Sequence, residues 1–133
     1  MAGYSGTPLV TKLGIKDAHT VLLDGLPDGL DLGNLGTAHV VRRLPSRASL
    51  DVTLTFHLER SGFERRLPQL IERTVSNGMI WVCWPKKASK VPTDLTENVV
   101  REIALADGVV DVKVAAIDEV WSGLKLVRRL ADR

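Results

Sequence analysis

Short runs of apolar residues, each bounded by polar or turn-forming residues, predict the strands of this chain. The run at 80–84 combines β-branched and aromatic residues, and Asn77 and Gly78 introduce it. Such a short, fully apolar run is typical of a strand that is buried on both faces. Pro85 ends it, because proline has no N–H to donate to a sheet. Four further stretches have strand character by β-branched content or alternating polarity: 20–23, 38–44, 51–58 and 109–117.

One amphipathic helix is predicted after the alternating stretch. Ser61 and Glu64 have the spacing of a capping box before an apolar stripe at helical spacing. Pro68 interrupts the stripe, so we expect the helix either to kink or to begin near it. The charged residues outside the stripe, Arg66 among them, are interpreted as a solvated face. A shorter helix is predicted to begin at Pro8.

A second amphipathic helix follows the apolar run at 80–84. Asp94 and Glu97 are spaced like a capping box, so Asp94 is predicted to cap this helix. Gly108 supplies a stop signal. The apolar face is predicted from residues that recur at helical spacing: Leu95, Val99, Val100 and Ile103.

The alternation of strands and helices predicts an α/β fold. We expect a Rossmann-like, mainly parallel sheet flanked by helices, in one domain over residues 1–133. A right-handed crossover is expected to place strand 109–117 parallel to and beside strand 80–84. Residues 121–127 follow across a short turn and are predicted to return as an antiparallel strand at the C-terminal end. This ending resembles the Rossmann-like fold of class I methyltransferases.

The composition is that of a globular domain and does not indicate a particular activity. Hydrophobic residues make up 44% and charged residues 26% of the 133 residues, which is ordinary for a globular domain. A formal net charge of +2 gives no reason to expect nucleic-acid binding. The sequence has neither a membrane-spanning stretch nor a signal-peptide pattern, so a cytoplasmic protein is expected. The single cysteine, Cys83, is interpreted as a core residue rather than a nucleophile.

The basic loop at 86–92 is the candidate ligand site. It leaves the carboxyl end of a strand and enters a helix start, where free N–H groups and the helix dipole favour anions. Ligands of open α/β sheets usually bind at that edge. The candidate residues come from this loop and from the last turn of the sheet: Trp84, Lys86, Lys87, Ser89, Lys90, Thr93, Trp121 and Ser122. A plainer interpretation stays open, in which the lysines only keep a surface loop soluble.

The search for catalytic motifs assigns no catalytic residue, no metal ligand and no cofactor. The residues after the first strand, 24–29, contain two glycines without the G-x-G-x-x-G spacing of dinucleotide sites, and they are interpreted as an ordinary turn. The three histidines are scattered without a metal-binding spacing: His19, His39 and His57. His57 is interpreted as a residue on the less buried face of its strand.

Three stretches of the chain are distinctive: GYSGTPLVTKLGIK near the start, GMIWVCWPKKASKVPTDLTE in the middle and VDVKVAAIDEVWSGLKLVRR near the end. In combination they resemble the bacterial proteins grouped as domain of unknown function 3052, found chiefly in actinobacteria. The resemblance covers nearly the whole chain. It implies a small cytoplasmic α/β domain with no established activity, and it carries over no catalytic residue.

The leading hypothesis from the sequence is a non-catalytic binding or regulatory domain. It would recognise a small anionic ligand or an acidic partner surface through Lys86, Lys87 and Lys90. One alternative is a reduced methyltransferase-like enzyme, against which the missing phosphate and adenosyl-ligand motifs count. The other is a protein–protein interaction module, in which Trp121 or the final strand forms the edge of a homo-oligomer.

Overall fold

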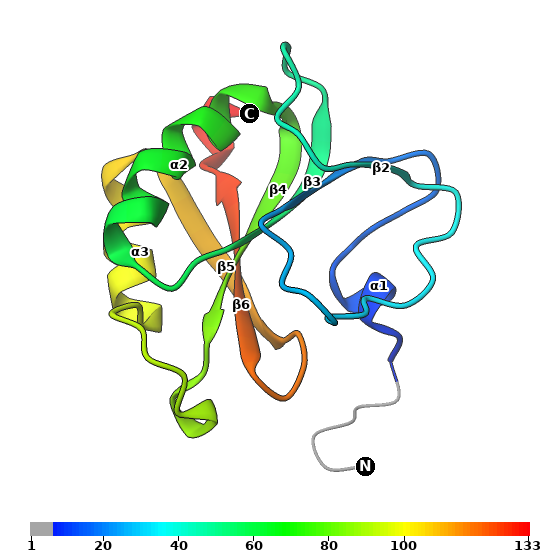
Figure 1. The fold of residues 1–133 in the computed structure, drawn as a ribbon. Coiled ribbons are helices and arrows are strands. Elements are labelled where there is room, and N and C mark those ends of the chain that lie inside the picture. The colour runs from blue at the N-terminus through cyan, green and yellow to red at the C-terminus, as the bar shows by residue number, and fades with distance from the viewer. Residues whose placement is uncertain (1–6) are drawn as a thin grey trace.

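Six strands form one sheet in the computed structural model, which describes residues 7–133 (Figure 1). The strands are β1 (Thr20–Asp24), β2 (His39–Val41), β3 (Leu50–Phe56), β4 (Thr74–Pro85), β5 (Val109–Ala116) and β6 (Trp121–Arg128). The helices are α1 (Leu9–Lys12), α2 (Arg60–Arg73) and α3 (Glu97–Ala106), with 3₁₀ turns η1 (Lys87–Ser89) and η2 (Leu130–Asp132). Residues 3–6, where the first distinctive stretch begins, lie outside the described residues.

The strand order is β2-β1-β3-β4-β6-β5. Strands β2, β1, β3 and β4 run parallel, and β6 pairs antiparallel with both β4 and β5. The predicted fold class is confirmed: an α/β, Rossmann-like and mainly parallel sheet with an antiparallel strand from the C-terminal end of the chain. The long alternating stretch became β3 and the apolar run became the carboxyl half of β4.

Strand β5 does not lie beside β4, contrary to the sequence prediction. Strand β6 lies between them, with its Leu124 opposite Val82 of β4 on one side and Val114 of β5 on the other. The prediction failed because the returning strand β6 pairs with both β4 and β5, and it can do so only from a position between them. The interaction-module alternative required a free edge on β6 for a homo-oligomer. Because β6 is paired on both sides, it offers no such edge.

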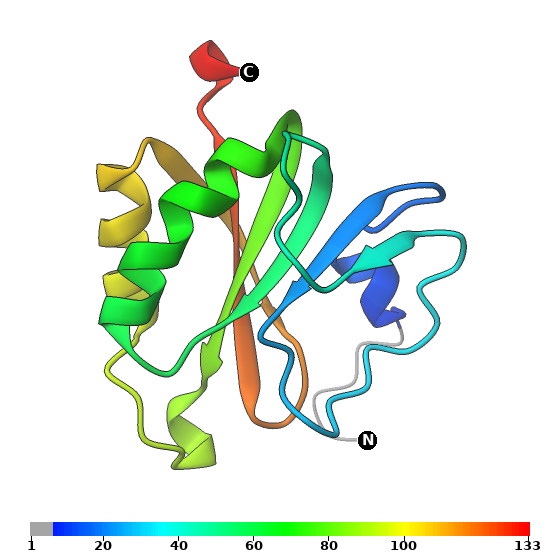
Figure 2. The same ribbon diagram turned by 45° about the horizontal axis from the view of Figure 1, so that its top comes forward.

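The two faces of the sheet are covered differently (Figure 2). Helices α2 and α3 pack on one face, where Phe63, Leu67 and Val100 are fully buried. The other face is covered by α1 and the irregular segment 25–38. On that face Trp81 is fully buried and its indole Nε1 donates a hydrogen bond to the carbonyl of Leu13 at 2.9 Å. This bond ties the N-terminal segment to the middle of β4.

The start of helix α3 corrects one prediction from the sequence. Thr96, not Asp94, is the N-cap of α3, because its side chain accepts the N–H of Val99 at 3.2 Å. Asp94 instead accepts the N–H of Arg60 at 2.6 Å, at the start of α2. Helix α2 spans 14 residues and contains Pro68 in its interior, so it does not begin near this proline. Within residues 7–133, no helix has the length and apolar character needed to cross a membrane.

Gly78 lies inside β4, although the sequence indicated that it comes just before the strand. A Cβ added at this position would meet the side chain of Thr74 and would lie 2.9 Å from the carbonyl oxygen of Leu50. The pairing of β3 with β4 shifts register beside it, between Leu50 and Val52. Glycine is therefore required here by the close approach of two strands rather than by a turn.

Candidate functional site

The sheet reverses its direction of winding between β1 and β3. From β1 the chain crosses to β2 over one face through residues 25–38, and from β3 it crosses to β4 over the other face through α2. In open α/β sheets, the carboxyl edge at such a switch point is the usual place for a ligand. Four polar side chains meet there, which we name the switch-point cluster: Asp24, Thr55, His57 and Arg66.

Asp24 is the centre of the switch-point cluster. It is the last residue of β1 and lies opposite Thr55 of β3 in the parallel register. Arg66 of α2 donates two hydrogen bonds to its carboxylate, from Nη2 to Oδ1 at 2.8 Å and from Nε to Oδ2 at 3.0 Å. The Thr55 hydroxyl donates to Oδ2 at 2.7 Å. Only 16% of the Asp24 side chain and 28% of the Arg66 side chain are exposed, so this ion pair is partly shielded from water.

His57 follows directly after β3 and joins the cluster through Thr55. Its Nε2 lies 2.7 Å from the Thr55 hydroxyl oxygen. Its backbone N–H donates to the carbonyl of Cys83 at 3.0 Å, and its ring lies 5.6 Å from the ring of Phe63, measured between centroids. The half-buried imidazole is therefore held from three sides, by β3, β4 and α2.

Burial and neighbouring charged groups have opposing effects on the pKa values of Asp24 and His57. Burial by itself would raise the pKa of Asp24, but the hydrogen bonds from Arg66 and Thr55 and the charge of Arg66 together lower it. Burial lowers the pKa of His57 more than the Asp24 carboxylate raises it, and Arg66 lowers it further. At neutral pH the cluster therefore combines an ionised carboxylate, a charged guanidinium and a neutral imidazole.

The predicted ligand residues in the loop after β4 mostly bind the protein itself. The Lys86 ammonium donates to the carbonyl of Asp118 at 2.9 Å, which fastens the loop to the β5–β6 turn. The Ser89 hydroxyl donates to the carbonyl of Lys86 at 2.7 Å. The Thr93 hydroxyl donates to the carbonyl of Leu58, beside the switch-point cluster. These contacts explain the three residues as parts of the loop's own structure.

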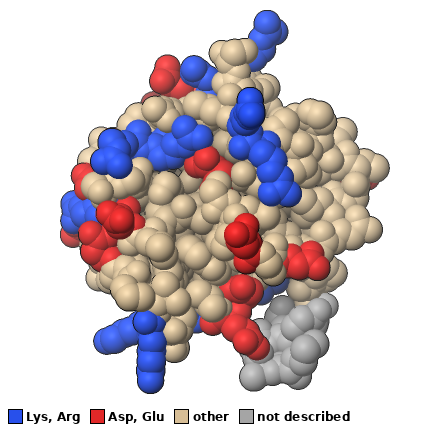
Figure 3. Space-filling view, in the orientation of Figure 1, with Lys and Arg blue, Asp and Glu red and all other residues tan. Residues whose placement is uncertain are grey.

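Lys87 and Lys90 are exposed, and they lie at the beginning and at the C-cap of the short turn η1. Figure 3 shows basic side chains that stand out from the body at the lower left, where this loop lies in Figure 1. Lys90 has a φ of 63°, in the left-handed region, where its N–H closes the turn onto the carbonyl of Lys87. Lys86 is thus bonded to the protein itself, whereas Lys87 and Lys90 are exposed to solvent.

Trp84 and Trp121 reach the same edge of the sheet, as predicted, because Trp84 pairs with Ser122 and Pro85 with Trp121. Their indoles nevertheless lie on opposite faces. Trp84 is buried under α2 and α3, whereas Trp121 packs in the other core, edge-on to Phe56 with centroids 5.3 Å apart. Trp121 lies opposite Pro85, the residue after Trp84. Because successive residues of a strand point to opposite faces, Trp121 and Trp84 lie on different faces of the sheet. The two indoles cannot wall a common cleft.

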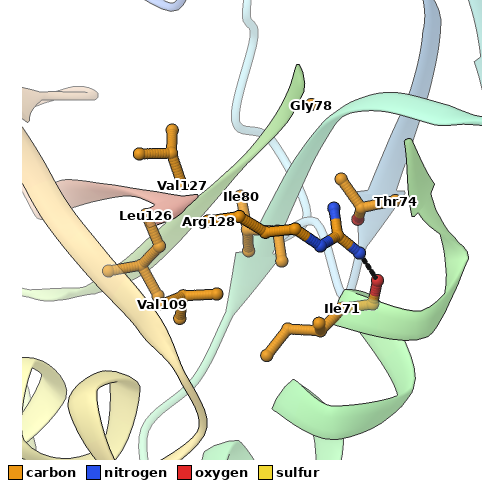
Figure 4. Close-up of a pocket in the computed structure, with 8 residues that line it drawn as sticks. All are labelled: Ile71, Thr74, Gly78, Ile80, Val109, Leu126, Val127 and Arg128. Carbon is orange, nitrogen blue, oxygen red and sulfur yellow. Dashed lines mark hydrogen bonds between the residues drawn. The ribbon is translucent and has the colours of Figure 1, made fainter. Parts of the chain in front are cut away.

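A small cavity at the opposite edge of the sheet does not offer a ligand site (Figure 4). Its volume of about 10 Å³ leaves room for about one water molecule. Arg128 crosses it and donates to the carbonyl of Ile71 near the end of α2 at 2.6 Å and to that of Val75 at the start of β4 at 2.8 Å. A cation in this place stabilises the helix end, so the arginine has a structural role.

Cys83 is fully buried in β4, which confirms its interpretation as a core residue. Burial raises the pKa of its thiol, and the negative charge of Asp118 adds to the effect. A thiol that stays protonated and has no access to solvent is a poor nucleophile.

The sequence interpretation missed the switch-point cluster, although two local signals point to it. Arg66 lies three residues after Phe63 and four before Leu70, so it borders the apolar stripe of α2 rather than its solvated face. His57 shares a strand face with Thr55 by the period of two, and this face is covered by α2. Only the pairing of β1 with β3, which the sequence does not specify, adds Asp24 to them.

Comparison with known proteins finds similarity in structure alone. No family model matches the chain, and no curated protein sequence matches it, so its resemblance to the domain of unknown function 3052 family stays a prediction. Among solved structures, the fold is similar to that of a SAM-dependent methyltransferase from Aquifex aeolicus, with a TM-score of 0.66 and 14% identity over 93% of this chain and 89% of the other.

Two further solved structures have the same fold with a bound ligand. One is the magnesium protoporphyrin IX methyltransferase of Synechocystis PCC 6803 with bound SAH, at TM-score 0.64 and 12% identity, covering 90% of this chain and 80% of that one. The other is the 1,6-didemethyltoxoflavin-N1-methyltransferase of Burkholderia thailandensis with bound S-adenosylhomocysteine, at TM-score 0.64 and 12% identity, covering 96% and 79%.

These likenesses overturn the leading hypothesis from the sequence. A non-catalytic binding domain built around the basic loop was predicted, with the methyltransferase-like protein as the alternative. The recurrence of methyltransferases among proteins of this fold favours the alternative. The error arose because the charge of the loop is visible in the sequence, whereas the complete strand order, which the chain shares with these structures, is not.

Proposed function

We propose that this protein is a reduced methyltransferase-like protein that binds an S-adenosyl ligand at the switch-point cluster. The observation that carries the proposal is the position of Asp24, an ionised carboxylate at the carboxyl end of β1 beside the switch point. The structural similarity to methyltransferases solved with S-adenosylhomocysteine supports the choice of ligand.

The residues of the cluster fit a ligand that donates hydrogen bonds. A carboxylate offers about four lone-pair positions, of which Arg66 and Thr55 use three on Asp24. The remaining position can accept from a hydroxyl or an ammonium group, and an S-adenosyl ligand carries both. In contrast, β1 is followed by the irregular segment 25–38 and not by a helix, so no helix N-terminus is available there for a phosphate.

The segment that follows Asp24 leaves the strand at once. Gly25 has a φ of +73°, a conformation that residues with a side chain rarely adopt, and a Cβ there would lie 3.5 Å from the carbonyl oxygen of Phe56. Gly29 also has a positive φ, and a Cβ there would meet nothing within 4 Å. An open turn of this kind gives a ligand access to the Asp24 carboxylate.

Each side chain of the cluster has a separate part in this proposal. When bound, S-adenosylmethionine supplies an activated methyl group. Asp24 would hold the ligand through the free acceptor position, and Arg66 keeps the carboxylate oriented from the side of α2. Thr55 joins the carboxylate to His57 and fixes the ring.

Titration calorimetry with S-adenosylhomocysteine tests the proposal, with ATP as the competing anionic ligand. We expect the protein to bind S-adenosylhomocysteine and not ATP, and Asp24→Asn to weaken the binding. Asp132→Asn removes the same charge from an exposed position of η2 and is expected to bind like the unaltered protein. Circular dichroism establishes that both variants are folded. The proposal fails if the unaltered protein does not bind S-adenosylhomocysteine, or if both variants bind it equally well.

A further inference from the structure

The hydrogen bonds of the switch-point cluster determine where His57 carries its proton. The ionised Asp24 carboxylate only accepts hydrogen bonds, so the single hydroxyl proton of Thr55 is used in the bond to Oδ2. The Thr55 oxygen must therefore accept from His57, whose Nε2 lies 2.7 Å away. The neutral ring then carries its proton on Nε2, and Nδ1 keeps a lone pair.

The other ring nitrogen, Nδ1, keeps its lone pair unused by the described part of the protein. No hydrogen bond to it is formed within residues 7–133, and a Cβ added at Gly62 of α2 would lie 3.8 Å from it. The charged groups that act on the ring are Asp24 from β1 and Arg66 from α2, and the ring is neutral at neutral pH. An oriented, neutral imidazole with a free lone pair is a proton acceptor.

We propose that His57 is the general base of this site, and that the methyl acceptor is a hydroxyl or a protonated amine. The inference rests on the proposed function. The proton of the acceptor's O–H or N–H group passes to Nδ1 of His57. The electron pair of the acceptor's heteroatom forms the new bond to the methyl carbon, and the pair of the broken carbon–sulfur bond stays on sulfur. Thr55 and Asp24 stabilise the resulting imidazolium through Nε2–H.

The first part of the test is nitrogen-15 NMR of the histidine side chains across a pH titration. We expect His57 to be neutral at pH 7 with its proton on Nε2. A ring protonated on Nδ1, or one that is already an imidazolium at pH 7, overturns the proposal. Thr55→Val removes the acceptor of the Nε2 proton, so a mixture of both tautomers is expected in that variant.

The second part measures access to Nδ1 with diethyl pyrocarbonate, which reacts with unprotonated imidazole nitrogens, followed by peptide mapping. The exposed His39 of β2 supplies an internal reference for the reaction rate. We expect His57 to react, and Gly62→Ala to slow it severalfold, because the new methyl group lies 3.8 Å from Nδ1. Alanine is favoured over glycine within a helix, so this variant is expected to fold. A His57 that does not react in the folded protein overturns the proposal.

Saturation with S-adenosylhomocysteine distinguishes this inference from the proposed function. Protection of His57 from diethyl pyrocarbonate, with His39 unaffected, supports both. If calorimetry establishes binding but His57 reacts at an unchanged rate, the base is elsewhere and only this inference fails. If no binding occurs while His57 reacts through Nδ1, the proposed function fails and the general-base role falls with it, although the proton assignment remains.

Discussion

Arg66 and Asp24 are separated by 42 residues in the chain, and the guanidinium of one holds both carboxylate oxygens of the other. This pair fastens the middle of α2 to the end of β1. Replacement by Arg66→Met leaves the partly buried Asp24 charge without its main partner. We expect a loss of about 2 kcal/mol in the free energy of unfolding.

Chemical denaturation measures this loss, with Arg65→Met as the matched control. Arg65 lies next in sequence on the same helix and is exposed. Its replacement is expected to leave the stability nearly unchanged. Equal stabilities for the two variants would mean that the ion pair contributes nothing beyond an exposed arginine.

Two threonines on the same face of β3 provide a second comparison. Thr53 is fully buried, and its hydroxyl oxygen has no hydrogen-bond partner within the described residues. Thr53→Val removes this unsatisfied group, so we expect unchanged or increased stability, by up to about 1 kcal/mol. Thr55→Val breaks the link between Asp24 and His57 and is expected to destabilise the protein. Thermal unfolding decides between them, and the reverse order would contradict the hydrogen bonds assigned to Thr55.

The lowered pKa of His57 predicts how the stability depends on pH. The unfolded chain begins to bind this proton near pH 6.5, whereas the folded protein binds it only at lower pH. The stability associated with neutral His57 is therefore complete above pH 6.5 and is lost as the pH falls through the folded pKa. His57→Gln is expected to show a smaller loss of stability between pH 7.5 and pH 5, measured by urea denaturation at each pH. Identical pH profiles would place the imidazole in an environment like water.

The two capping residues are expected to act on different helices. Thr96→Ala removes the cap of α3, and Asp94→Ala removes the acceptor for the first N–H of α2. Each change is expected to cost about 1 kcal/mol. Hydrogen exchange resolves where each acts, with faster exchange at the start of α3 in the first variant and at the start of α2 in the second. Faster exchange in α3 after Asp94→Ala would restore the cap that the sequence suggested.

Much of the fold follows from local periodicity. The apolar run at 80–84 became a buried strand, and the helical spacing of Val100 and Ile103 gave the correct buried face of α3. Such patterns are readable because a strand or a helix face needs only neighbours within one element. The position of β6 between β4 and β5 is not encoded in this way, since it depends on which strands pair.

The candidate site was less readable for the same reason. The charge of the basic loop is local, but its lysines prove to be a hydrogen-bonded or outward-pointing set. The switch-point cluster joins Asp24, Thr55 and Arg66 from three elements, and no spacing in the sequence connects them. The sequence therefore indicated the edge of the sheet at which we propose the site, but not the residues of the switch-point cluster.

The most direct test of the proposed site is NMR mapping of S-adenosylhomocysteine on the labelled protein. We expect the largest backbone shift changes in residues 24–29 and at His57. Smaller changes are expected at Leu58, whose carbonyl accepts a hydrogen bond from Thr93. Lys87 and Lys90, which are exposed, are expected to remain unchanged. Shift changes confined to Lys87 and Lys90, or none at all at saturating ligand, would contradict the assignment of the ligand to the switch point.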